Sequence, residues 1–219
     1  LGIDAAGKVY KASVSSLADS ADLRLVNNGS HITSDAGVGS NGTSAGADSV
    51  IAIGAGAGNA NSAPHNVYIG AGAGSSNTGA IANTFIGYKS GNKTTTGVAN
   101  TATGHQSLTN NTTGIGNTAT GYAAMDSNIS GHNNTAMGVG AIGRNTTGNG
   151  NTASGRQALI NNKSGNNNVA YGYGTLQNTT GSENSGFGAG ALYSNSSGDS
   201  NVAVGRESGA NITTSVNLA

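Results

Sequence analysis

Catalytic or metal-binding chemistry in this chain would have to come from its four histidines and nine carboxylates, because the 219 residues include no cysteine. Metal sites need several such side chains on one surface, and His31, His65, His105 and His132 have no acidic cluster beside them. The acidic residues form no pair that recurs at a fixed spacing, whereas glycoside hydrolysis needs two facing carboxylates. We therefore expect no catalytic residue, no metal site, no cofactor and no enzyme activity.

Three other motifs point to chemistry only weakly. The stretch GNGNTASG at 148–155 is similar to a phosphate-binding loop, but neither a Lys-Ser/Thr pair nor a helix follows it. Thr-x-Thr pairs at 101–103 and 118–120 would suit an ice-binding face, yet the pattern ends in the next unit. Asn-x-Ser/Thr sequons, which we attribute to turn composition, occur at Asn92, Asn111, Asn145, Asn178, Asn195 and Asn211.

Composition and charge exclude several classes of protein. Gly (38), Asn (30), Ser (26) and Thr (23) make up over half of the chain, while a single proline excludes collagen. Nine basic and nine acidic residues cancel, so the chain lacks the basic patch that nucleic acid requires. No apolar run approaches the roughly 18 residues of a membrane-spanning helix. The start at Leu1, without Met or signal peptide, indicates a segment or a processed form.

A repeat of 17 residues organises most of the chain. Its signature Asn-x-x-x-Gly runs from NVYIG at 66–70 to NVAVG at 201–205, and VIAIG at 50–54 fits without the asparagine. Seven spacings between closing glycines are 17 residues and two are 16. These glycines are Gly54, Gly70, Gly87, Gly104, Gly121, Gly138, Gly155, Gly172, Gly188 and Gly205. Because 17 residues without a 3.6-residue period are too few for a helical hairpin, we predict an all-β fold, a parallel β-solenoid (β-roll) of about ten coils.

Two columns of side chains recur inside the unit. Two residues before the closing glycine stands Ala in most units, as at Ala102 and Ala136, with Tyr68 and Phe85 as exceptions. Four residues after the closing glycine stand Leu108, Met125, Ile142, Leu159, Leu176 and Leu192. The core of a single coil is thin, so the alanine column and the apolar column suit packing against other copies about a threefold axis. We therefore predict a homotrimer. A second glycine recurs in most units, as at Gly114, and we expect it to lie in a turn with positive φ, which glycine adopts without strain.

The asparagine that opens each unit is predicted to form a structural ladder. In such a ladder each side-chain amide bonds to the coils above and below, as in stacked strands. The ladder residues are Asn66, Asn83, Asn100, Asn117, Asn134, Asn151, Asn168, Asn184 and Asn201.

The two positions after each closing glycine vary and carry large polar or aromatic side chains. We expect an outward ridge of rings and hydrogen-bonding groups that could bind a glycan or another polar polymer. The alternative is that this ridge is only the solvated side of a rod. Its candidate residues are Tyr88, Lys89, His105, Gln106, Tyr122, Arg156, Gln157, Tyr173 and Arg206.

The ends of the chain depart from the repeat. We predict an N-terminal connector or cap over residues 1–46, beginning with a short strand pair. The β-roll domain follows at 47–210, and residues 211–219 form a degraded last coil or a linker to a further C-terminal region. The first coils carry AGAG at 55–58 and 71–74 in place of the apolar column, so they should pack differently.

Over residues 49–210 the chain resembles the YadA-like head repeats of trimeric autotransporter adhesins, left-handed parallel β-rolls with strands of the type N-S-V-A-I-G. SVIAIG at 49–54, NVYIG, NTAMG and NVAVG are similar to those strands. The chain looks equally like the shafts of phage tail-fibre proteins, which run N-T-A-x-G-x-x-A-L-x-x-N-T-T-G. This resemblance implies a homotrimeric, extracellular fibre for surface attachment.

We therefore predict the repeat shaft or head of an extracellular attachment fibre, on a virion tail or a bacterial cell surface. Its expected partners are two further copies of itself and a glycan or protein receptor on a host cell. Neither nucleic acid nor direct membrane insertion of this segment is expected. The alternative is a structural spacer or self-assembling extracellular filament with no ligand site, because an exposed end coil is an open sheet edge.

Overall fold

A computed structural model of the chain describes residues 2–3, 9–10 and 50–215. The chain divides into two compact units, Leu1–Ile32 and Thr33–Ala219. In the first unit β1 (Gly2–Ile3) and β2 (Val9–Tyr10) pair antiparallel, as the strand pair predicted at the start of the chain requires. The rest of the predicted connector at 1–46, and residues 216–219 of the predicted last segment 211–219, lie outside the described residues.

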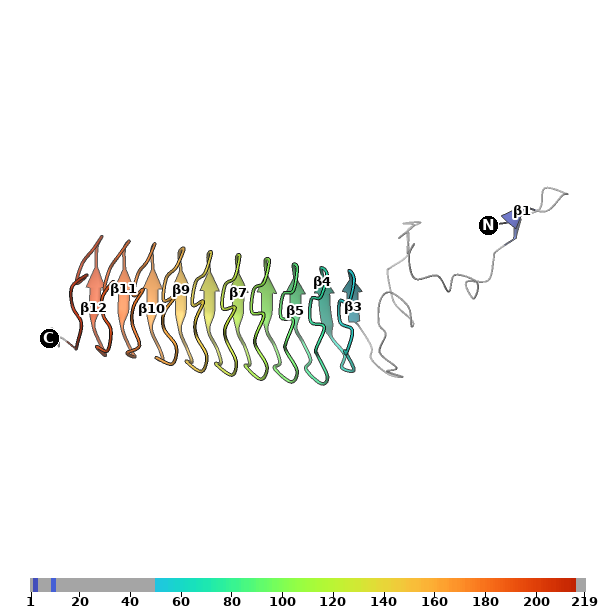
Figure 1. Cartoon of the computed structure of the whole chain (residues 1–219), viewed down its shortest axis with the longest axis horizontal. Helices are drawn as coiled ribbons and strands as arrows, with labels where there is room; N and C mark the ends of the chain where they lie inside the picture. The colour runs from blue at the N-terminus through green and yellow to red at the C-terminus, as the bar shows by residue number, and fades with distance from the viewer. Residues whose placement is uncertain (1, 4–8, 11–49, 216–219) are drawn as a thin grey trace. The chain divides into compact units, whose positions relative to one another are not determined.

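Residues 50–215, the described part of the second unit, form a parallel β-solenoid with one strand from each coil (Figure 1). Neighbouring strands are offset by one repeat, so Ala102 pairs with Ala119 and Ala119 with Ala136. The ten strands follow one another in sequence order, and the described residues contain no helix. They are β3 (Val50–Ile53), β4 (Asn66–Ile69), β5 (Thr84–Ile86), β6 (Thr101–Thr103), β7 (Thr118–Thr120), β8 (Thr135–Met137), β9 (Thr152–Ser154), β10 (Val169–Tyr171), β11 (Ser185–Phe187) and β12 (Val202–Val204). The predicted fold class is thereby confirmed.

The core of the solenoid is made by the alanine column and the apolar column together. In most strands only the middle residue points inward, because side chains alternate along a strand. Ala136 and Ile142 are both fully buried within the single chain. The prediction that these columns form surfaces for contact between copies is therefore wrong, since a coil closes on itself and covers them.

In two of the first coils the sizes of the two core residues are reversed: the strand carries the large residue and the turn carries the small one. Tyr68 and Phe85 replace alanine on the strand, and glycine replaces the apolar residue at Gly74 and Gly91. A methyl group added at Gly74 or Gly91 would overlap the Tyr68 or Phe85 ring. The two buried rings lie 5.7 Å apart between centroids. The first coils thus pack differently, as expected, while filling the same interior.

Close stacking of the coils explains both recurrent glycines. At the closing position Gly121 has φ 131°, and an added Cβ would lie 2.7 Å from the carbonyl oxygen of Gly138 in the next coil. At the second position, an added Cβ on Gly148 would lie 2.5 Å from the Gly165 oxygen. Gly148 is not among the residues with positive φ. The predicted reason for the second glycine is therefore wrong: it is required by space and not by backbone conformation.

Candidate functional site

The opening asparagines stack into a buried ladder that holds the coils in register. The backbone N–H of Asn117 donates to Asn100 Oδ1 at 2.9 Å, and its Nδ2 donates to the same oxygen at 3.2 Å and to the Gly131 carbonyl at 2.8 Å. Asn134 and Asn151 repeat this arrangement one and two coils further on. Because buried amides are costly unless they are hydrogen-bonded, the ladder is a structural element and no ligand site.

A second buried asparagine ladder, which the sequence reasoning missed, lies seven residues after the closing glycine. Asn128 Nδ2 donates to Asn111 Oδ1 at 2.8 Å, and Asn145 Nδ2 donates to Asn128 Oδ1 at 2.7 Å. Asparagine recurs at this position in most units, so the signal was present in the sequence but was attributed to turns. The sequon asparagines Asn111, Asn145 and Asn195 are among the residues of this ladder position that are fully buried and hydrogen-bonded.

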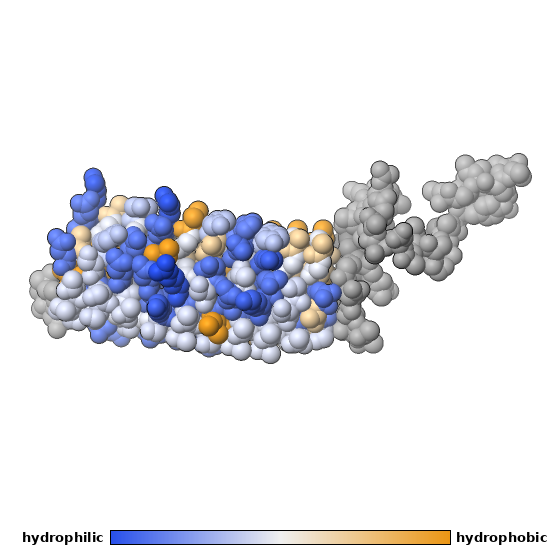
Figure 2. All heavy atoms as spheres, viewed as in Figure 1, coloured by the Kyte–Doolittle hydropathy of each residue, from blue (hydrophilic) through white to orange (hydrophobic). Residues whose placement is uncertain are grey.

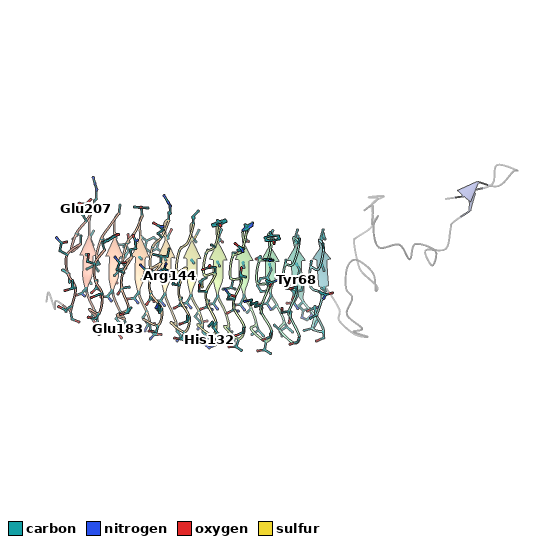
Figure 3. The ribbon with its side chains drawn as sticks, in the orientation of Figure 1. Tyr68, His132, Arg144, Glu183 and Glu207 are labelled. Carbon is teal, nitrogen blue, oxygen red and sulfur yellow. The ribbon has the colours of Figure 1, made fainter. Side chains whose placement is uncertain are left out.

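The predicted ridge residues lie along one edge of the solenoid, on the outside of the coils. Seven of the nine side chains are exposed, whereas Gln106 and Gln157 are half-buried. The backbone keeps the ridge in register, because the N–H of Gln106 donates to the Tyr88 carbonyl at 2.8 Å and that of Gln157 to the Val139 carbonyl at 2.9 Å. Figure 3 shows Glu207, which continues the ridge, on the edge opposite to His132 and Glu183.

The first part of the ridge is a stack of three rings. Tyr88 and His105 lie 4.9 Å apart between centroids, and His105 and Tyr122 lie 5.3 Å apart. The Lys89 ammonium lies 5.2 Å from the centre of the Tyr88 ring. Since each ring covers a face of its neighbour, this stack presents mainly ring edges and polar atoms to solvent.

The second part of the ridge contains a groove. The Arg156 guanidinium lies over the Tyr173 ring, 5.8 Å from its centre. Beyond Tyr173 the ridge drops to Ala189 and Gly190, and a cavity of about 600 Å³ opens there. Its walls include Tyr173, Tyr193, Arg206 and Glu207.

The opposite edge carries a third chain of hydrogen bonds between coils. The His132 Nδ1 accepts the backbone N–H of Ile115 at 3.1 Å, and the His132 N–H donates to Asn149 Oδ1 at 2.8 Å. Of the other three histidines, His105 belongs to the ring stack, His65 is exposed directly before β4, and His31 lies outside the described residues. Within residues 50–215 and the β1–β2 pair, no three His, Cys, Asp or Glu side chains are placed to hold a metal ion.

The outward face of the ten-stranded sheet carries no charged residue. Its two columns are the first and third residues of the strand triplets, and Met137, Tyr171 and Phe187 are among its exposed apolar side chains. The rings of Tyr171 and Phe187 stack at 5.6 Å. The Thr-x-Thr pairs of β6 and β7 lie in the middle of this face, between apolar residues of the flanking strands. Figure 2 shows by contrast that the face of the solenoid in view is mostly pale or hydrophilic, with scattered hydrophobic side chains.

Two ionisable groups are shifted by their surroundings. Burial raises the pKa of the Tyr68 phenol to about 12, although a hydrogen bond from Asn77 Nδ2 opposes this shift. Partial burial also raises the pKa of the Asp126 carboxyl, against hydrogen bonds from Ser127. Tyr68 lies inside the coil, as Figure 3 shows, so this shift belongs to the core and not to a catalytic site.

Comparisons with protein-family models, curated proteins and solved structures give no match. Among the described residues no helix is long and apolar enough to cross a membrane. The function must therefore be argued from three surfaces of the solenoid: the ridge, its groove and the uncharged sheet face.

Proposed function

We propose that the chain is the repeat shaft of an extracellular homotrimeric attachment fibre, of a phage tail or a bacterial surface, that binds a cell surface. The observation that carries this proposal is the ridge, where aromatic and polar side chains repeat at coil spacing on a rigid support. Such side chains combine ring surface with hydrogen-bonding groups, which suits recognition of a glycan or a protein receptor. The resemblance to adhesin heads and tail-fibre shafts points the same way.

Rigidity supports a role as a shaft. Ten coils spaced at about 4.8 Å make a rod of about 48 Å. Each coil is joined to the next by strand pairing, and the ladder of opening asparagines adds hydrogen bonds between neighbouring coils from Asn66 to Asn201. Because these bonds run along the rod, bending it would break several of them at once.

The uncharged sheet face supports a homotrimer. Charged residues are depleted in the cores of protein interfaces, and this face has none over ten strands although the other surfaces carry Lys, Arg, Asp and Glu. Met137 is 51% and Phe187 40% exposed in the single chain. We assign the face to the same face of two further copies, so that the three ridges point outward.

A structural spacer or self-assembling filament is the second candidate function. It is favoured by the stacking pattern itself, because each strand of the solenoid pairs in parallel with the strand one repeat further on. A strand of another copy can continue a pattern of this kind. In that case copies would join end to end and the ridge would have no ligand.

Cell binding separates the two candidates. Fluorescently labelled chain is added to bacterial and to animal cells, and the bound fluorescence is measured by flow cytometry with and without excess unlabelled chain. We expect saturable binding to at least one cell class that the unlabelled chain displaces. Heat-unfolded chain serves as the control. If binding is equally weak for folded and unfolded chain on all cells, the attachment function is wrong and the spacer function takes its place.

A further inference from the structure

The groove in the second part of the ridge is a consequence of two small residues. In the column that starts directly after the closing glycine, Tyr173 is followed by Ala189 and then by Arg206. The next column has Gly174, then Gly190 and then Glu207. Ala189 and Gly190 therefore form a low floor between Tyr173 on one side and Arg206 and Glu207 on the other, two coil spacings or about 10 Å apart. The cavity of about 600 Å³ falls within the range of roughly 300–1,000 Å³ that is usual for small-ligand pockets.

We propose that this groove binds a neutral saccharide of one or two sugar rings, an inference that rests on the proposed attachment function and gives it a ligand class. The walls supply both kinds of group that a pyranose needs. Tyr173 and Tyr193 are 54% and 40% exposed, and an aromatic ring can pack against the C–H face of a sugar. The guanidinium of Arg206 donates hydrogen bonds and the carboxylate of Glu207 accepts them, which matches hydroxyl groups that do both.

The charge pattern selects a neutral sugar over an acidic one. Arg206 and Glu207 form an ion pair at 3.0 Å, and both side chains are largely exposed. The guanidinium is therefore already balanced by a carboxylate, and the groove has no surplus positive charge for a sulfate, phosphate or uronic acid.

The orientation of Tyr173 further distinguishes the groove from the rest of the ridge. Arg156, from the preceding coil, lies over the Tyr173 ring, while the groove opens on the side of the following coil. In the ring stack, the side of the following coil is covered by His105 at Tyr88 and by Tyr122 at His105, and Val139 follows Tyr122 in the same column. At Tyr173 the following residue is the small Ala189, which leaves room for a sugar face.

The test uses the full chain, fluorescently labelled, on a printed array of neutral and acidic oligosaccharides, followed by calorimetric titration with the best neutral binder. Tyr173→Ala removes one wall, and Ala189→Tyr fills the floor with a residue that the same column accepts at Tyr88 and Tyr122. Each variant should weaken binding about tenfold or more. Ile115→Ala, which truncates an exposed apolar residue on the opposite edge of the solenoid, is the control and should leave the affinity unchanged.

The proposal is overturned if no neutral oligosaccharide binds, if only acidic ones bind, or if Ile115→Ala weakens binding as much as Tyr173→Ala. Circular dichroism of each variant establishes that the solenoid is intact before the affinities are compared. The same variants on cells separate this proposal from the attachment function. If the wild-type chain binds cells and Ala189→Tyr binds them equally well, the groove is not the site and the attachment function stands.

Discussion

Single residues in the core of this solenoid are matched to one another across the coil. Tyr68 is fully buried, and its hydroxyl accepts a hydrogen bond from Asn77 in the second ladder. In the next coil Phe85 replaces the tyrosine and Thr94 replaces the asparagine. Thr94 Oγ1 is a buried side-chain atom of the described chain without a hydrogen-bond partner. In these two coils the asparagine stands beside the ring that carries a hydroxyl and the threonine beside the ring that lacks one.

The buried phenol predicts a loss of stability at alkaline pH. The pKa of Tyr68 rises from its ordinary value of 10.0 to about 12 in the folded chain. Its contribution to stability is therefore complete below pH 10 and is lost as the pH rises through 12, by about 3 kcal/mol in all. Urea unfolding at pH 9 and pH 12 measures this, and Tyr68→Phe should lose less stability between the two than the wild type. Tyr122→Phe is the exposed control; equal losses in all three proteins would contradict the prediction.

At the scale of elements, each coil combines one short inward-facing strand with a turn that has unusual backbone conformations. The apolar column lies in that turn, and Leu108, Met125 and Ile142 all have φ between 51° and 52°. This left-handed region is costly for β-branched residues such as Ile142 and free for glycine. The turn therefore accepts glycine without strain wherever the facing strand supplies a large ring.

This exchange predicts strong coupling between a strand and its turn. Ala136→Phe alone overfills the core and Ile142→Gly alone leaves a cavity, each of which should cost about 2 kcal/mol or more. Together they reproduce the Phe85–Gly91 arrangement, so the double variant should recover about 1–3 kcal/mol relative to the sum of the single changes. Urea unfolding of the four proteins gives this coupling.

The matched control replaces Ile160, a half-buried residue on the outer part of a turn, by glycine. Ile160→Gly should not rescue Ala136→Phe. Additive effects of Ala136→Phe and Ile142→Gly would mean that the two columns do not share one interior.

The elements were predictable from the sequence to the extent that their cause is local. The Asn-x-x-x-Gly repeat predicted the strands, because a fixed period and β-branched residues are properties of the chain itself. That Ala136 and Ile142 face only the interior of their own chain was not predictable, since a column of alanines and a column of apolar residues suit contacts inside one coil and contacts between copies equally well. The groove at Ala189 and Gly190 was also missed. It exists because these two residues are small while the coils on either side carry large side chains, and the sequence places those coils far apart along the chain.

At the scale of the whole molecule, the solenoid has surfaces of different character. The ridge is polar and aromatic, the opposite edge is held by bonds such as Ile115 N–H to His132, and the outward sheet face is uncharged. A rod that kept its sheet face in water would expose Met137, Tyr171 and Phe187 together. Exposed apolar patches of this kind mark sites of protein contact, which is the reason for assigning the face to other copies of the chain.

Sedimentation equilibrium of the purified chain tests the proposed trimeric shaft most directly. The wild type should have a mass three times the 21.1 kDa of one chain, because we propose that the uncharged sheet face packs against two further copies. Met137→Lys, which places a charge on that face, should sediment as a monomer. Val139→Lys, equally exposed but on the ridge, should stay trimeric. A wild-type chain that sediments at 21.1 kDa at all concentrations, or a Met137→Lys variant with unchanged mass, would contradict the account.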